Sequence, residues 1–288
     1  MLNKNIETFI ACESEYEDAD IVMFGAPFDS TTSFRSGTRF GPKAIRSESF
    51  GIETYSPYQD KDLEDINVFD SGNIELPMGS NEKALEMIYE RTKIILDDKK
   101  IPFLVGGEHL VTFGSFKAVY EKYRDVNIVH FDAHADLRDN YLGVKLSHAC
   151  VIRRCHDLVG DGKIYQFGIR SGEKQEFIFA KKHTKMNKFD FRTLSDAIAQ
   201  LKNQPVYFTL DLDVLDPSIF SGTGTPEAGG VTFNELLNAV ISVCSRLNIV
   251  GMDICELAPD YDHSGVSTAV ACKILREMLL AVNNKEEN

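Results

Sequence analysis

The feature that most constrains this fold is the regular recurrence of short apolar segments along the chain. Their β-branched and aromatic residues form continuous runs rather than alternating patterns, which is typical of strands covered on both faces. The runs lie at residues 20–29, 65–72, 101–107, 126–136, 163–170, 205–216 and 248–257. Stretches with helical spacing lie at 81–100, 111–123, 232–244 and 266–282. This alternation predicts an α/β fold, with a mostly parallel sheet between two helix layers.

Length, composition and charge exclude several classes of protein. The 288 residues contain no linker, repeat or low-complexity segment, so we expect one domain over residues 1–288. No apolar run reaches the roughly 18 residues of a membrane span, and residues 1–20 lack the pattern of a secretory signal. The net charge of −13 argues against nucleic acid or an anionic membrane as partner. It would suit a small cationic ligand, although solubility alone explains it.

The cysteines indicate a reducing compartment. None belongs to a CxxC pair, so we expect reduced core residues of a cytoplasmic protein rather than disulfides or a zinc site. They are Cys12, Cys150, Cys155, Cys244, Cys255 and Cys272.

Three polar segments coincide with the ends of apolar runs. They are GGEHLVTFG (106–114), DAHADLRD (132–139) and TLDLDVLDPS (209–218). Open α/β sheets bind ligands at the carboxyl edge of the strands, and alternate residues of an extended chain face the same side. We therefore expect six side chains to converge at this edge: His109, Asp132, His134, Asp136, Asp211 and Asp213.

Such a cluster predicts two metal ions. Four carboxylates and two imidazoles are too many for one ion, whereas two divalent cations neutralise the four aspartates. Bridging carboxylates can hold two ions roughly 3.5–4 Å apart and activate a shared water. The oxygen-rich set without thiolate favours Mn²⁺ over zinc, with Fe²⁺ or Co²⁺ as possible substitutes.

The remaining polar residues have plainer interpretations. His130 lies deeper in its strand and is interpreted as a hydrogen-bonded core histidine, and Asp216, before a proline, as a turn residue. Glu108 and Asp139 are expected to hydrogen-bond ligands or backbone. The surface or structural histidines, which lack an acid-rich sequence context, are His156, His183 and His263.

These segments resemble motifs of the ureohydrolase family, which comprises arginases, agmatinases and relatives. GGEHLVT is similar to its GGDH-type motif, FDAHADLRD to DAHxD, and TLDLDVLDPSIFSGTGTPEAGGVTFNEL to SxDxDxxDP…GTGTPxxGG. SFRSGTRFGPKAIR (33–46) also resembles a family signature. The resemblance runs from about residue 20 to about residue 282, with Glu108 in place of the usual Asp and Thr209 in place of the common Ser.

The resemblance implies a three-layer α/β/α sandwich with an eight-stranded parallel sheet, in a homotrimer or homohexamer. It implies one Mn²⁺ held by His109, Asp132, Asp136 and Asp211, and another held by Asp132, His134, Asp211 and Asp213. It further implies that Glu256 binds a guanidinium group, that His148 shuttles a proton, and that Thr225 places a hydroxyl near the substrate.

The expected reaction is attack of a metal-bridging hydroxide on a guanidinium carbon, which releases urea and an amine. A protein that kept the metals but lost catalysis, with a regulatory role, is the alternative in a different class. The presence of both His148 and Glu256 beside the full ligand set favours the enzyme.

The sequence before His148 suggests the substrate. Arginases hold the α-carboxylate of arginine with an Asn and a Ser, two and four residues before this histidine, where this chain has Leu146 and Val144. An unpaired buried carboxylate costs about 1–3 kcal/mol, which agmatine avoids. We therefore expect agmatine to be hydrolysed to putrescine and urea. Arginase, guanidinobutyrase and formimidoylglutamase activities are the alternatives, with Lys145, Arg153 and Arg154 as candidate partners for a substrate acid.

Overall fold

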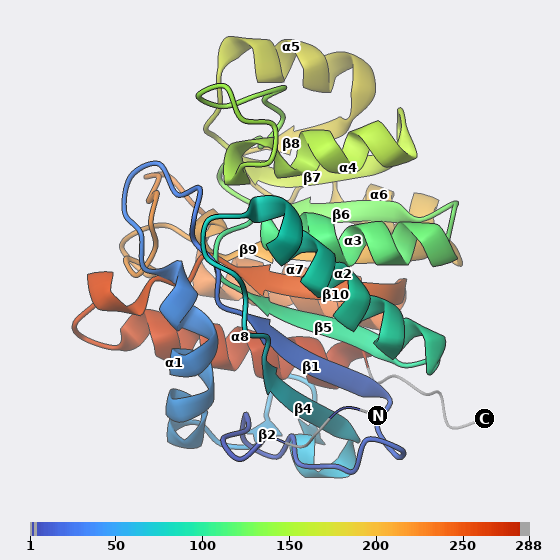
Figure 1. Cartoon of the computed structure of the whole chain (residues 1–288), viewed down its shortest axis with the longest axis vertical. Helices are drawn as coiled ribbons and strands as arrows, with labels where there is room; N and C mark the ends of the chain where they lie inside the picture. The colour runs from blue at the N-terminus through green and yellow to red at the C-terminus, as the bar shows by residue number, and fades with distance from the viewer. Residues whose placement is uncertain (1, 3–4, 283–288) are drawn as a thin grey trace.

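The protein has a central sheet of eight parallel strands, seen in a computed structural model that describes residue 2 and residues 5–282 (Figure 1). The strand order is β4-β1-β5-β10-β9-β6-β7-β8. The strands are β1 (Ile21–Ala26), β4 (Val68–Asn73), β5 (Ile101–Gly106), β6 (Asn127–Phe131), β7 (Ile164–Ile169), β8 (Lys185–Lys188), β9 (Pro205–Asp211) and β10 (Asn248–Cys255). A separate two-stranded hairpin pairs β2 (Tyr55–Ser56) with β3 (Lys61–Asp62). The expected eight-stranded parallel sheet is confirmed.

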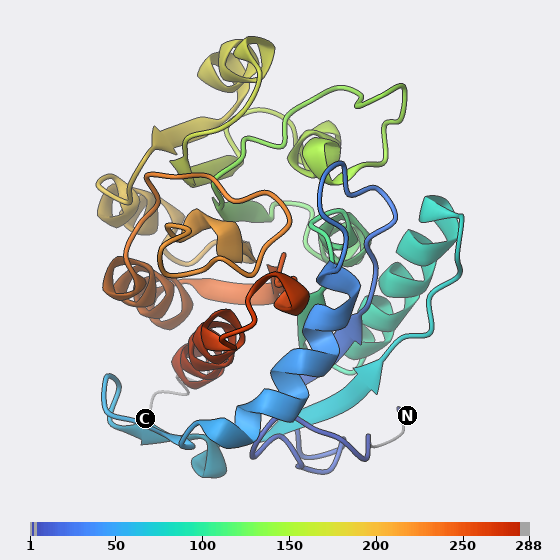
Figure 2. The same cartoon turned by 90° about the vertical axis from the view of Figure 1, so that its left-hand side faces the viewer.

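Helices cover both faces of this sheet (Figures 1 and 2). They are α1 (Gly41–Glu48), α2 (Asn81–Asp97), α3 (Val111–Lys122), α4 (Val151–Val159), α5 (Lys174–His183), α6 (Leu194–Leu201), α7 (Phe233–Arg246) and α8 (Val266–Val282). Helices α2, α3 and α4 pack in sequence on one face, in front of the sheet in Figure 1. On the other face α8 packs against both α1 and α7. Within the described residues, no helix has both the length and the apolar character needed to cross a bilayer.

The two-sided cover explains why the strand sequences are continuously apolar. Ile21 and Met23 of β1 lie in the same buried cluster as residues of α7 and α8. Val22 and Phe24 point to the other face, where they join a cluster with residues of α2. Since successive side chains of a strand face opposite sides, burial of both faces requires an apolar residue at every position.

The apolar pattern indicated seven of the eight strands, and β8 is the exception. Its sequence KMNK contains one apolar residue, and its side chains are partly or fully exposed at the edge of the sheet. An edge strand with charged residues carries no apolar run to detect. The run at 126–136 also overestimates its strand, because β6 ends at Phe131 and the acidic segment follows as a loop.

The topology brings the polar segments together. Strands β5, β10, β9 and β6 are neighbours in the middle of the sheet, although they are far apart in sequence. Their carboxyl ends lie along one edge, where ligands bind in open α/β sheets. The residues that follow these four strands therefore share one location.

A glycine fixes how the chain leaves β5 toward the site. Gly107 donates its backbone N–H to the carbonyl oxygen of Ala26 over 2.9 Å. A Cβ atom at Gly107 would lie 2.0 Å from the carbonyl oxygen of Phe28, which is backbone and cannot yield as a side chain can. Only glycine permits this close approach, which sets the position of His109 two residues later.

We expect Gly107→Ala to lower the free energy of unfolding by about 1–3 kcal/mol or more, because overpacking against backbone forces the turn to shift. The matched control is Gly51→Ala, where an added Cβ meets nothing within 4 Å and φ is not in the left-handed region. Chemical unfolding of both variants measures the difference. Equal stability of the two variants would contradict this account of the turn.

Candidate metal centre and active site

The acidic and imidazole side chains gather at the carboxyl ends of the four central strands. His109 follows β5 and Glu256 follows β10. The segment after β6 carries Asp132, His134 and Asp136, while β9 ends at Asp211 and the short helix η5 (Leu212–Val214) carries Asp213. All six side chains that the sequence placed here as candidate ligands therefore lie at the same edge.

Asp132 lies between the two imidazoles and joins two groups of donor atoms. Its Oδ2 atom is 3.1 Å from Nδ1 of His109, and its Oδ1 atom is 3.5 Å from Nδ1 of His134. The first group is completed by Asp136 and Asp211, whose Oδ2 atoms are 3.1 Å and 3.5 Å from Nδ1 of His109. In the second, Asp213 Oδ2 is 2.9 Å from Nδ1 of His134. Asp132, His134 and Asp213 could hold one metal ion. The carboxylates around Nδ1 of His109 could hold a second, with Asp132 shared.

A hydrogen-bond chain orients His109. The Thr209 hydroxyl donates to Asp253 over 2.7 Å, so it must accept from Nε2 of His109, which lies 2.9 Å away. The proton is thereby placed on Nε2, and in neutral His109 the Nδ1 lone pair faces the carboxylates. A lone pair directed at carboxylates requires a proton or a metal ion between them. Asp253 was not among the sequence candidates, because nothing in its local sequence distinguishes it from a strand residue.

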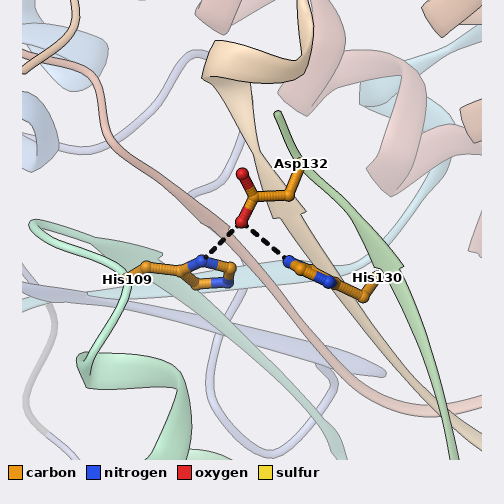
Figure 3. A group of neighbouring side chains, drawn as sticks. All are labelled: His109, His130 and Asp132. Carbon is orange, nitrogen blue, oxygen red and sulfur yellow. Dashed lines mark hydrogen bonds and ion pairs between the residues drawn. The ribbon is translucent and has the colours of Figure 1, made fainter. Parts of the chain in front are cut away.

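His130 supports Asp132 and has no free ligand atom. Its Nε2 donates to Asp132 Oδ2 over 2.8 Å, as Figure 3 shows beside the contact from His109. Its Nδ1 accepts from the side-chain amide of Gln166 over 3.1 Å. Both ring nitrogens are therefore used, and the side chain is fully buried. The interpretation of His130 as a hydrogen-bonded core histidine is confirmed.

Two residues of the site have left-handed backbone conformations. Asp136 has φ 52° and Glu256 has φ 69°. Such values cost roughly 1–3 kcal/mol for residues other than glycine, and they concentrate at functional sites. In Glu256 the strained backbone accompanies a carboxylate whose Oε1 accepts the N–H of His109 over 2.7 Å, which directs the side chain toward the metal ligands.

Electrostatics shows that the cluster requires added positive charge. Burial, reinforced by the charge of Asp213, raises the pKa of Asp211 well above its ordinary value. Burial and Asp132 raise the pKa of Asp136 to about 7. Burial opposes protonation of His109, but the carboxylates of Asp132 and Asp136 outweigh it and raise the imidazole pKa. Without metal the cluster must take up protons, and divalent cations would replace them.

The donor set fits metal ions in number, type and spacing. Oxygen atoms predominate, the nitrogens are imidazole, and no thiolate is present, which suits Mn²⁺ better than zinc. Ligand atoms roughly 2.1 Å from an ion and at right angles to one another are about 3.0 Å apart. The contacts around His109 and His134 are 2.9–3.5 Å, close to that spacing.

A loop after β1 holds His148 above the cluster. Glu108 accepts the Thr31 hydroxyl proton over 2.5 Å, and Thr31 Oγ1 in turn accepts the backbone N–H of His148 over 3.0 Å. Nδ1 of His148 lies 3.3 Å from the same hydroxyl oxygen. Because the hydroxyl proton is donated to Glu108, Nδ1 must carry a proton and donate to this oxygen. The lone pair of the neutral ring is therefore on Nε2. Burial lowers the pKa of His148 to about 4, so the ring is a neutral base at pH 7. The expectation that Glu108 bonds backbone is confirmed, since it also accepts Thr31 N–H.

These groups line a cavity of about 280 Å³, near the lower end of the usual size for small-molecule sites. Its wall contains His148, Glu256 and Thr225, and the hydroxyl of Thr225 is 3.4 Å from Asp213. Leu146 and Val144 do not line it. The wall also contains residues that the sequence did not single out for this role: Ser33, Arg138, Tyr141, Ser171, Glu173 and Glu176.

The other candidate residues lie outside the cavity. Asp139 is exposed and accepts from the Arg154 side chain over 3.1 Å, so the expectation that it bonds a ligand or backbone is wrong. Asp216 accepts the backbone N–H groups of Ser218 and Gly229, which confirms its interpretation as a turn residue. All six cysteines are buried and unpaired.

The fold and this site define a hydrolase of the arginase type, and the chain belongs to the arginase family, whose sequence model matches residues 19–281. The agmatinase of Bacillus subtilis (strain 168) is 48% identical over 277 residues, which cover 95% of this chain and 96% of the relative. A crystal structure from Clostridium difficile is 51% identical, with a TM-score of 0.91 over 94% of this chain and 99% of that one. The agmatine ureohydrolase of Thermoplasma volcanium is 32% identical, with a TM-score of 0.87 over 96% and 94%.

The protein is accordingly an enzyme of the ureohydrolase group, which hydrolyses guanidino compounds. The resemblance inferred from the motifs is confirmed, and the similarity extends over nearly the whole chain.

We expect Asp211→Asn to lose more bound metal than a substitution of His109, because the resemblance to the family implies that Asp211 binds both ions, and its loss would leave positive charge uncompensated in a buried site. Bound Mn²⁺ and urea release are measured on purified variants. The matched control is Asp139→Asn, which makes the same change at an exposed aspartate outside the cavity. Full metal content and near-native turnover in Asp211→Asn would show that this ligand assignment is wrong.

Proposed function

We propose that this enzyme is a manganese-dependent agmatinase, which hydrolyses agmatine to putrescine and urea. The observation that carries this proposal is the charge of the cavity. Besides the proposed metal ligands Asp136 and Asp211, three carboxylates line it: Glu173, Glu176 and Glu256. Among the described residues, Arg138 is the one Lys or Arg side chain in its wall.

Arg138 is already neutralised. Its guanidinium lies 3.0 Å from Glu173 and 3.4 Å from Glu176. A substrate with a distal carboxylate would meet these two acids and would have to displace them from Arg138. A substrate with a distal ammonium group meets a favourable potential instead.

The basic side chains considered as partners for a substrate carboxylate lie outside the cavity wall. Arg154 bonds Asp139 and Asp157, Arg153 lies over the ring of Phe179, and neither lines the cavity. Lys145 does not line it either. These placements weigh against arginase, guanidinobutyrase and formimidoylglutamase activities, which require a carboxylate to be received.

The residues around the cluster have complementary roles in this proposal. His109, Asp132, Asp136 and Asp211 would hold one Mn²⁺, and Asp132, His134, Asp211 and Asp213 the other. The two ions, when bound, supply the Lewis acidity that activates water for attack on the guanidinium carbon. Thr209 and His130 keep the ligands His109 and Asp132 in the required orientation.

Glu256 and His148 act on the substrate itself. Oε1 of Glu256 is held by the N–H of His109, so its other oxygen is available to grip the planar N–H fork of the guanidinium. Nε2 of His148, which lies 3.4 Å from the Ser33 hydroxyl, would carry a proton from the attacking water to the departing amine. Thr225 would contribute a hydroxyl near the reacting group.

Further properties of the chain complete the proposal. The names of similar proteins, such as the Bacillus subtilis agmatinase, support the same substrate. We also propose that residues 1–288 form one domain and that it assembles as a homotrimer or homohexamer in the cytoplasm.

A metal-binding protein without catalysis is the competing hypothesis, and the presence of both Glu256 and His148 in the cavity disfavours it.

We expect His148→Phe to retain two Mn²⁺ per chain but to lose roughly 10²–10⁴-fold in kcat, the usual range for a group that transfers protons. Metal analysis and steady-state urea release give the two quantities. The same substitution at the exposed His263 should change neither quantity. Loss of metal in His148→Phe would show instead that His148 has a structural or ligand role.

We expect kcat/KM for agmatine to exceed kcat/KM for arginine by about 5–150-fold, since an unpaired carboxylate costs roughly 1–3 kcal/mol in the bound state. Urea release by the Mn²⁺-loaded protein is compared for agmatine, arginine and guanidinobutyrate. An arginine or guanidinobutyrate value equal to that of agmatine would overturn the substrate assignment. No urea from any guanidino compound would favour the non-catalytic hypothesis.

A further inference from the structure

A second group of metal-type side chains lies outside the active site. It consists of His156 in α4, Asp161 in the turn that follows, and His183 at the end of α5. Neither histidine lies in an acid-rich sequence context, and both were interpreted as surface or structural residues. The fold places Oδ1 of Asp161 between them, 2.9 Å from Nε2 of His156 and 2.7 Å from Nδ1 of His183.

The turn that carries Asp161 is fixed to both helices. Gly160 ends α4 with φ 75°, and its N–H donates to the carbonyl oxygen of His156 over 2.8 Å. Gly162, also with φ 75°, donates its N–H to the carbonyl oxygen of His183 over 3.0 Å. These two bonds hold Asp161 against the ends of α4 and α5, at the β7–β8 end of the sheet (Figure 1).

An aromatic ring holds the two imidazoles in place. Phe179 stacks on His183 with ring centroids 4.2 Å apart, and it meets the ring of His156 edge-on at 4.9 Å. Nδ1 of His156 is buried without a hydrogen-bond partner. Its orientation therefore depends on packing and on the single contact between Nε2 and Asp161.

The ligand types point to a class of ion. All three ligand atoms lie within 4.8 Å of one another, as in a site that three residues coordinate from one side. Two imidazoles and one carboxylate suit a borderline cation such as Zn²⁺, whereas the oxygen-rich active site suits Mn²⁺. Asp161 is 65% exposed and His183 is 31% exposed, so water can complete the coordination.

We propose that His156, Asp161 and His183 form a second, surface metal site that binds Zn²⁺. The ion would tie the carboxyl end of α4 to the carboxyl end of α5. Helix α4 follows directly on η4 (His148–Cys150), so the ion would stabilise a helix whose amino end adjoins the segment that carries His148. Because the folded chain alone brings the three ligands together, binding would stabilise the folded state.

The test uses the full-length protein already loaded with Mn²⁺. Zn²⁺ is added, unbound metal is removed by desalting, and both metals are counted per chain by mass spectrometry. Thermal unfolding is recorded with and without Zn²⁺. The variants are His183→Gln and Asp161→Asn, conservative changes at a partly buried and an exposed side chain. The matched control is His263→Gln, at an exposed histidine outside every metal-type group among the described residues.

The expected result is one additional Zn²⁺ per chain with no loss of Mn²⁺, accompanied by a higher Tm. The added zinc and the Tm shift should disappear in His183→Gln and Asp161→Asn and persist in His263→Gln. Both site variants should keep wild-type urea release without zinc, which shows that they fold. Zinc that merely replaces Mn²⁺, or zinc binding equal in all variants, would overturn the proposal and leave Asp161 as an ordinary ion-pair partner of the two histidines.

Discussion

The buried carboxylate of Asp132 is the interaction on which the rest of the active site depends. It is inaccessible to water, yet hydrogen bonds from His109, His130 and His134 hold its pKa well below the ordinary range despite burial. A buried charge of this kind is stable only when its partners are fixed around it. Each oxygen faces a different imidazole of the candidate metal groups, so displacement of Asp132 would disturb both groups at once.

The surrounding structure serves to keep these partners in place. The close passage of Gly107 against Phe28 positions the turn before His109, and the chain from Asp253 through Thr209 determines which ring nitrogen of His109 faces the cluster. The left-handed conformation of Glu256 adds backbone strain that the packed sheet edge must support. The charged groups thus lie at or directly after the ends of packed central strands, which keeps the geometry ready for cations and substrate.

Much of this arrangement was accessible from the sequence because its causes are local. Apolar runs report burial on both faces, and alternation within DAHAD reports which side chains share a direction. Other features lack a local signal. Strand β8 is polar because it lies at an edge, and Asp253 resembles any strand residue until Thr209 and Tyr207 are placed beside it. The substrate wall was also misplaced by sequence reasoning, which considered Val144 and Leu146 rather than Arg138, Glu173 and Glu176.

The sequence by itself determined the α/β class, the family and the six acidic and imidazole side chains of the central cluster, since periodicity and motif spacing express forces between neighbours in the chain. Only the tertiary structure decided which charges compensate one another. Arg138 is neutralised by Glu173, which is 35 residues further along the chain, and Asp161 joins two histidines from different helices. Electrostatic interaction depends on distance in space, and that distance is set by how strands and helices pack rather than by separation along the sequence.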